Sequence, residues 1–209
     1  VENGGSISNN FDIKVKSAEG IGMYAKGGAL ASVAKVSELK GNKSIGYVFE
    51  NITNAINMPN SVQLTDTNAT GQVGVAVKGT GAGLTVAGVS VVGSKNIGIY
   101  NETTGAVTNN GALNVADSTG DSSIGIYSQG GTVTSTGNAT IGKNSVGIYG
   151  KDAGAKLSGD MTVDEKGIGL YVDNDTTKPT VNTEITGKLE VGNNGTIGIQ
   201  ATNSNIKLG

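Results

Sequence analysis

The chain has 209 residues, with 35 Gly, 2 Pro and no Cys, His or Trp. Apolar residues make up 36% of it, and with the glycines this content is typical of a folded domain rather than a disordered one. The formal net charge of −2 is too small to steer the chain to nucleic acid or a membrane surface. All fifteen basic residues are Lys, so the usual Arg contacts to bases are excluded.

Other absences exclude most familiar catalytic sites. Without His or Cys there is no Ser-His-Asp triad, Cys-His pair, ordinary zinc site or disulfide framework. The sequence contains no run of 18 apolar residues, so no membrane-spanning helix is predicted. The sequence starts at Val1 with no secretion signal in view. We therefore expect a processed or excised piece.

A tetrad recurs along the whole chain: a β-branched residue, Gly, an apolar residue and often Tyr. Its starts lie 22 to 29 residues apart, and the eight copies begin at Ile21, Ile45, Val73, Ile97, Ile124, Val146, Ile168 and Ile197. A repeat of this length is typical of solenoid proteins.

Two further segments keep step with the tetrads. An apolar-polar-apolar triplet occupies residues 13–15, 62–64, 89–91, 113–115, 139–141, 161–163 and 189–191. The copy after the first tetrad is irregular, with Val36 and Leu39 out of phase. A looser strand lies between tetrad and triplet, at residues 84–86, 106–108, 132–134, 155–157 and 180–182. The period of two within these segments predicts strands, and Gly and Asn between them predict tight turns.

One such unit is too thin to bury its own apolar residues, so neighbouring units must stack and pair strand on strand. The sequence therefore predicts an all-β fold, a right-handed parallel β-helix (β-solenoid) of about eight coils with three short strands per coil. The right hand follows by analogy with other parallel crossovers. We expect residues 1–209 to form a single segment, a slice of a longer fibre.

The recurring SIGIY and SVGIYGK strings, the Asn/Gly/Thr/Lys-rich turns and the lack of Cys resemble the passenger regions of type V autotransporter adhesins, above all the large fusobacterial ones. The resemblance covers residues 21–200. It implies a β-helical passenger that is exported through the outer membrane, displayed on the cell surface and used in attachment and virulence. It also implies a membrane link only through a C-terminal translocator, which is not in this sequence.

The Tyr residues are the first candidates for a binding site. If the first and third residues of each tetrad point inward, Gly and Tyr point outward. Tyr100, Tyr127, Tyr149 and Tyr171 then form a strip on one face, with Tyr24 further along the same line and Tyr47 out of pattern. Such a strip could contact a sugar or a protein. The alternative, which we favour, is a ladder of rings that stabilises the sheet.

Carboxylates and glycines are the other candidates. Asp173 and Asp175 belong to an insertion at residues 173–179 that could touch a receptor, although a tolerated length variant is the simpler interpretation. Asp160, Asp164 and Glu165 could suggest an acid/base pair, but other repeats do not reinforce them. The glycine-rich residues 79–83 predict a turn rather than a phosphate loop, because no helix is expected after them.

These observations favour a structural and adhesive segment of a surface fibre that is not an enzyme. We expect no catalytic, cofactor-binding or metal-binding residues and no cofactor. The expected partner is a protein or glycan receptor on a host cell or another bacterium, and no nucleic acid. The alternatives are a fragment of a β-helical carbohydrate-active enzyme and a binding module that uses the Tyr strip.

Overall fold

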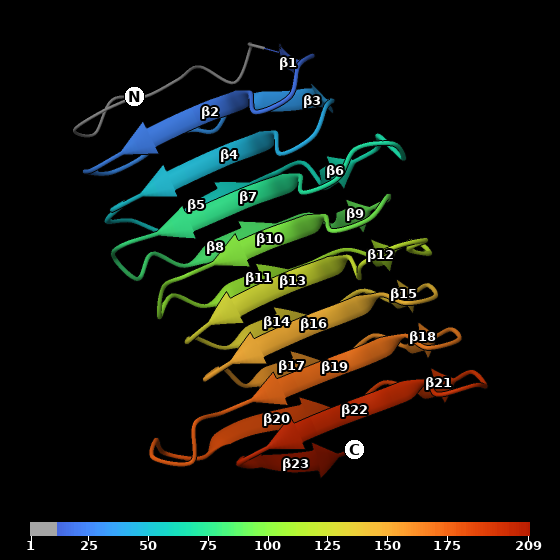
Figure 1. Cartoon of the computed structure of the whole chain (residues 1–209). Coiled ribbons are helices and arrows are strands. Elements are labelled where there is room, and N and C mark those ends of the chain that lie inside the picture. The colour runs from blue at the N-terminus through green and yellow to red at the C-terminus, as the bar shows by residue number, and fades with distance from the viewer. Residues whose placement is uncertain (1–11) are drawn as a thin grey trace.

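The protein is a parallel β-solenoid of about eight turns (Figure 1). The structure is a computed structural model, and it describes residues 12–209. These residues form 23 strands and no helix. All the paired strands run parallel, so each turn of the chain lays its strands beside those of the turn before. The all-β stacked fold predicted from the repeats is confirmed.

The chain passes through three sheets in each coil, and the tetrads all fall in one of them. We call it the tetrad sheet, and its strands stack in chain order (Figure 1). They are β2 (Ile21–Lys26), β4 (Ile45–Glu50), β7 (Val73–Lys78), β10 (Ile97–Asn101), β13 (Ile124–Gln129), β16 (Val146–Lys151), β19 (Ile168–Asp173) and β22 (Ile197–Thr202). The predicted single file of tetrads is therefore present.

The other two sheets hold the shorter strands. The middle sheet contains β5 (Ile56–Met58), β8 (Leu84–Val86), β11 (Val107–Asn109), β14 (Val133–Ser135), β17 (Ala155–Leu157), β20 (Val181–Ile185) and β23 (Ser204–Leu208). The triplet sheet contains β6 (Val62–Leu64), β9 (Val89–Val91), β12 (Leu113–Val115), β15 (Ala139–Ile141), β18 (Met161–Val163) and β21 (Leu189–Val191). In the first coil, β1 (Asp12–Val15) pairs only with β3 (Lys35–Leu39), with a register shift, as the irregular spacing there predicted.

The orientation of the tetrads corrects one expectation. Their third residues do point inward, and Ile99 and Ile126 are fully buried. The first residues are mostly half-buried or exposed, with Ile21 51% accessible. Glycine, expected outside, faces the interior instead: a β-carbon on Gly98 would come within 2.5 Å of Val89 Cγ1. The triplet sheet lies so close behind the tetrad sheet that only a hydrogen atom fits at this position.

The core is a set of ladders of small apolar side chains that run along the solenoid. The inward residues of the triplets are nearly all buried, as are those of the middle sheet, and together they form one continuous cluster. Each apolar residue packs on the equivalent residue of the next coil. Every coil therefore depends on its neighbours for burial, as expected for stacked repeats.

A column of buried polar residues marks the corner before each long strand. In five successive coils it contains Ser44, Gln72, Asn96, Ser123 and Ser145. The backbone amide of Gln72 donates to Asn96 Oδ1 at 2.8 Å, and the backbone amide of Asn96 donates to Ser123 Oγ at 3.1 Å. These side chains satisfy backbone groups that the turn leaves unpaired.

Two sharp corners per coil need left-handed backbone. Positive φ occurs two residues before the tetrad in seven coils, at Glu19, Lys43, Gly71, Lys95, Asn144, Lys166 and Gly195, and again after the long strand at Gly27, Asn51, Gly79, Gly130, Asp152 and Asn203. A residue with a β-carbon is strained in this conformation by about 1–2 kcal/mol. The Lys corners are therefore weak points of the scaffold.

Replacing Lys166 (φ 55°) by Gly should stabilise the protein. Relief of the left-handed strain outweighs the extra backbone entropy of Gly, so we expect the free energy of unfolding to rise by up to about 1 kcal/mol. Lys156→Gly is the matched control, because Lys156 lies in the middle of strand β17. There the same exchange should lower the free energy of unfolding by about 1 kcal/mol. Denaturant unfolding measures both, and a loss of stability in Lys166→Gly would contradict the prediction.

Candidate functional site

The Tyr strip predicted from the sequence is present on the outer face of the tetrad sheet. Tyr100, Tyr127, Tyr149 and Tyr171 are register partners on four successive strands. Successive ring centroids lie 5.0, 5.2 and 4.8 Å apart. The first pair is stacked, the second is edge-to-face and the third is tilted. The rings therefore form the stabilising ladder that we favoured.

The ladder also limits what the strip can bind. Each ring turns a face or an edge towards its neighbour, and a sugar that stacks on an aromatic ring needs an open face. Tyr127 and Tyr149 have a ring on both sides, whereas Tyr100 and Tyr171 have one on a single side, next to Ala76 and Gln200 on the other. Such an amphipathic strip suits a protein partner better than a stacked sugar.

The two remaining predictions for Tyr residues are confirmed. Tyr24 belongs to the same column but is separated from Tyr100 by Val48 and Ala76. Tyr47 points into the core, where its hydroxyl accepts a 2.6 Å hydrogen bond from the Val36 amide. The strip thus runs without interruption over four coils only.

Three rings of the strip, Tyr100, Tyr127 and Tyr149, have raised pKa values. The Tyr100 hydroxyl donates to Glu102 Oε1 at 2.7 Å, and this bond, together with partial burial, raises the pKa of Tyr100 to about 12. Burial also raises the pKa of Tyr127 and Tyr149, because a phenolate loses hydration beside other rings. The uncharged rings can therefore lie side by side without repulsion.

Alkaline titration should show this protection. Because the pKa of Tyr100 is raised, its neutral hydroxyl stabilises the fold below about pH 10, and this contribution disappears as the pH approaches 12. We expect most tyrosinate absorbance of the native chain to appear above pH 10, accompanied by loss of β-sheet circular dichroism. In denaturant the same groups should titrate near their ordinary pKa of about 10. Superimposable native and denatured titrations would contradict the assignment.

A column of charged residues runs beside the Tyr strip. It lies two residues after the Tyr position and contains, in successive coils, Lys26, Glu50, Lys78, Glu102, Gln129, Lys151, Asp173 and Thr202. Ion pairs join Lys26 to Glu50 at 3.0 Å and Lys78 to Glu102 at 3.9 Å. We call it the charged column. Of its members, the sequence analysis singled out only Asp173. The others also lie five residues after the first residue of each tetrad, so the repeat alone locates them.

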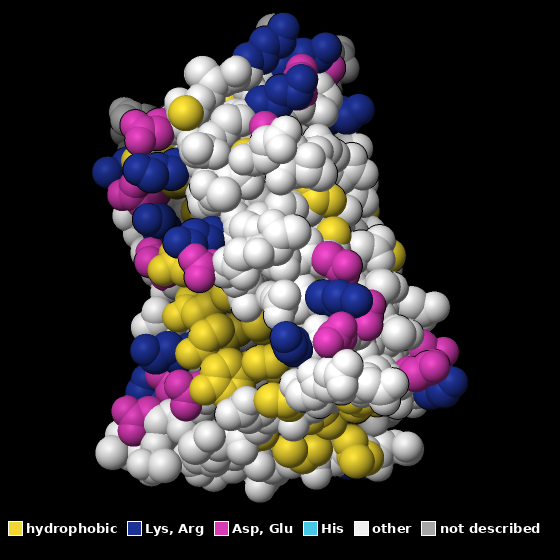
Figure 2. Space-filling model, turned by 45° about the vertical axis from the view of Figure 1, so that its right-hand side comes forward, with side chains coloured by type: hydrophobic (Ala, Val, Ile, Leu, Met, Phe, Trp, Pro, Cys, Tyr) yellow, Lys and Arg dark blue, Asp and Glu magenta, His cyan; other side chains and the backbone are white. Residues whose placement is uncertain are grey.

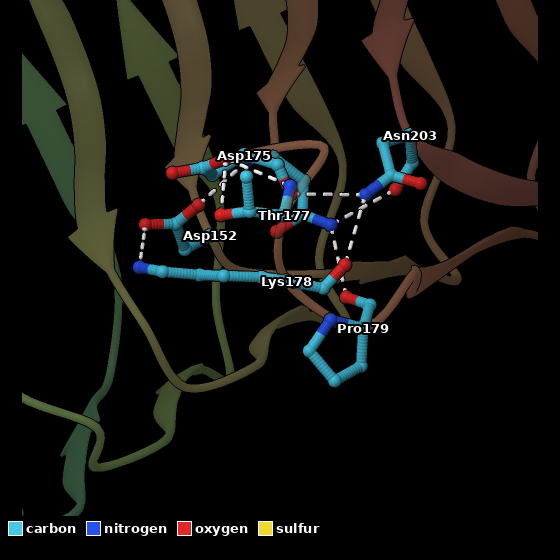
Figure 3. A network of polar contacts seen from close by, with 7 residues as sticks. Asp152, Asp175, Thr177, Lys178, Pro179 and Asn203 are labelled. Atoms are coloured by element: carbon cyan, nitrogen blue, oxygen red, sulfur yellow. Dashed lines mark hydrogen bonds and ion pairs between the residues drawn. The ribbon is translucent and has the colours of Figure 1, made fainter.

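The insertion after β19 is a tightly bonded loop (Figure 3). The Asp175 carboxylate accepts hydrogen bonds from the Thr177 amide at 2.9 Å and hydroxyl at 2.8 Å. The Asp175 amide donates to Asp152 Oδ1 at 2.8 Å, and Lys178 forms an ion pair with the same Asp152 side chain. Asn203 Nδ2 donates to the carbonyls of Asp175 and Lys178 at 3.1 and 3.2 Å. The loop is therefore tied to the coils on both sides.

These contacts account for the carboxylates of the loop. The hydrogen bond from the Asp175 amide and the Lys178 ammonium lower the pKa of Asp152. Hydrogen bonds from Thr177 lower the pKa of Asp175. Both groups are ionised at neutral pH and hold the loop in place. Asp173 ends strand β19 in the charged column, and its backbone carbonyl accepts a 3.0 Å hydrogen bond from the Asp152 amide.

Each of the other carboxylates that were considered for catalysis has a local partner in the structure. Asp160 precedes strand β18, and its Oδ1 accepts a hydrogen bond from the Lys188 amide at 2.9 Å. Asp164 follows that strand, and its Oδ1 accepts from the Glu165 amide at 2.7 Å. Glu165 pairs with Lys143 at 3.3 Å. Over residues 12–209, no three His, Cys, Asp or Glu side chains gather into a group that could hold a metal ion.

The glycine-rich segment and a shallow surface groove are also explained by the turns of the solenoid. Residues 79–83 form a turn that leads into strand β8, with the Thr80 hydroxyl donating to the Ile52 carbonyl at 3.0 Å. A shallow groove of about 610 Å³ crosses the triplet sheet beside Asp117 and Asp164. Asp117 Oδ1 accepts the Lys143 amide at 2.8 Å, so this carboxylate is already used to fix a corner.

Comparison with models of protein families, with curated proteins and with solved structures finds no match to this chain. In the described part of the chain, no helix has the length and apolar character needed to cross a membrane.

Proposed function

We propose that this chain is a structural and adhesive segment of a bacterial surface autotransporter passenger. The observation that supports the proposal is the unbroken stack of eight tetrad strands. At about 4.8 Å per coil such a stack is a rod on the order of 35–40 Å long. A rod of this kind can hold binding regions away from a cell and can itself present columns of side chains to a receptor.

The contacts also suit export in an unfolded state. Each coil packs on its neighbours, so a chain that emerges from a pore can fold coil by coil without waiting for a distant segment. The lack of Cys means that no disulfide can form before passage. These two properties are what the resemblance to autotransporter passengers requires of a segment.

Adhesion can be tested with the purified chain. Fluorescent beads that carry the chain should bind to epithelial cells or to other bacteria more strongly than albumin-coated beads. A variant chain with both Tyr127→Ser and Tyr149→Ser, shown to be folded by circular dichroism, tests on the same beads whether the Tyr strip takes part in binding. Binding no better than that of albumin beads on any cell type tried would contradict the adhesive role.

The enzyme alternative has its own test. Incubation of the chain with a panel of polysaccharides should release no new reducing ends if the protein is a fibre segment. Sustained release that scales with protein concentration would favour a carbohydrate-active enzyme instead.

A further inference from the structure

The outer face of the tetrad sheet carries three parallel columns of side chains. The first residues of the tetrads form a half-buried β-branched column, the rings form the Tyr strip, and the charged column borders it. Figure 2 shows hydrophobic side chains gathered over the lower half of the molecule, with Lys and Asp or Glu beside them. An aromatic strip with a charged border has the composition of a protein interface.

The charges of this border are self-complementary. Around the coil of Gln129 the charged column has the order Lys78, Glu102, Gln129, Lys151, Asp173. Reversal of this order sets Asp173 opposite Lys78 and Lys151 opposite Glu102. We infer that this face binds a second copy of the chain in antiparallel orientation, about a twofold axis through the coil of Gln129. The pairing goes beyond the proposed function and does not depend on it.

The Tyr strip fits the same axis. Tyr127 lies in the coil of Gln129 and faces Tyr127 of the second copy, while Tyr100 faces Tyr149 of that copy. Ring edges and hydroxyls meet across the interface, where Tyr is a favoured residue. A twofold axis makes every contact occur twice, so two unlike charge pairs become four.

Neighbouring registers are disfavoured by the same charges. A slip of one coil in one direction sets Lys78 opposite Lys151, and a slip in the other sets Glu102 opposite Asp173. A parallel arrangement would place the charged column of one copy against the β-branched column of the other. Like charges and unpaired charges on apolar surface both oppose binding, so the column disfavours the two neighbouring registers and the parallel direction. An axis between Glu50 and Lys78 would match the charges equally well, but it would leave Tyr127, Tyr149 and Tyr171 outside the contact, so the Tyr strip favours the axis through the coil of Gln129.

The pairing should be weak and sensitive to salt. The column from Lys78 to Asp173 spans four intervals, or about 19 Å, which is short compared with stable protein interfaces. Exposed ion pairs are screened at physiological ionic strength. We therefore expect a dissociation constant of about 100 µM or above. The affinity should decrease further as salt is added.

Cysteine crosslinking tests the axis, because the chain has no Cys of its own. Packed sheets lie about 10 Å apart, so a short thiol-reactive crosslinker can join two copies of Gln129→Cys. The matched control is Thr140→Cys, which is also exposed but lies on the triplet sheet. We expect crosslinked dimer to form at least about tenfold faster with Gln129→Cys at low salt.

Charge reversal tests the direction. In the Gln129→Cys background, Lys151→Glu sets a carboxylate against Glu102 of the second copy and should reduce crosslinking to the rate of the Thr140→Cys control. Lys156→Glu makes the same change of charge on the middle sheet and should leave the rate unchanged. Circular dichroism shows that each variant is folded. Equal rates for Gln129→Cys and Thr140→Cys, or no effect of Lys151→Glu, would overturn the proposal.

Discussion

Replacing Gly125 by Ala is expected to destabilise the solenoid by about 3 kcal/mol or more. The added β-carbon would lie 2.7 Å from the Gly147 carbonyl oxygen, 2.6 Å from Leu113 Cδ1 and 2.9 Å from Val115 Cγ2. Two of these atoms belong to buried side chains of the triplet sheet and one to the backbone of the next coil, so none can move away freely. Unfolding in denaturant, followed by circular dichroism, measures the loss.

Gly120→Ala is the matched control. Gly120 has an ordinary φ, and a β-carbon there would meet only the Ser94 side chain at 3.6 Å, a normal contact. We expect a change within about 0.5 kcal/mol, as for most surface substitutions. Equal effects of the two substitutions would show that the two sheets do not approach as closely as described.

Truncation of Ile126 to Ala should cost about 3–4 kcal/mol. Ile126 is fully buried in the fifth tetrad strand, with Ile99 and Ile148 as its partners in the coils on either side. Its removal leaves a cavity that the stacked ladders on both sides keep open, because they cannot collapse inward without breaking register. The free energy of unfolding from denaturant titration is the quantity to compare.

Ile199→Ala makes the same change at the same tetrad position of the last described coil. Ile199 is only partly buried, so less apolar surface is lost and the remaining side chains can relax. We expect no more than about half the loss seen for Ile126→Ala. A larger loss at Ile199 would contradict the view that each residue depends on coils on both sides.

The repeat made most of the fold predictable. Strand pairing in a solenoid requires equivalent residues every turn, so the positions of Ile97, Ile124 and Val146 in the sequence already indicated their neighbours in space. The ring ladder followed from the same alignment. The short third strand was predicted in five coils, and the structure adds β5 and β23 to them.

Two features could not be predicted from the repeat. The direction of Gly98 depends on how closely the triplet sheet approaches, which is a packing distance that a period of two cannot supply. The left-handed corners at Lys95 and Lys166 use residues that rarely adopt positive φ, so their composition gave no turn signal. The charged column was overlooked for a simpler reason, since it lies at the end of the long strand and resembles a polar turn.

The most direct test of the account is a set of distances along the charged column. Spin labels on Lys26 and, in turn, Gln129, Lys151, Asp173 and Thr202 span four to seven coil intervals. With spin-diluted samples, stacked coils predict distances that grow in even steps of about 4.8 Å, from about 19 to about 34 Å. Distances that fail to increase with each coil would contradict the solenoid.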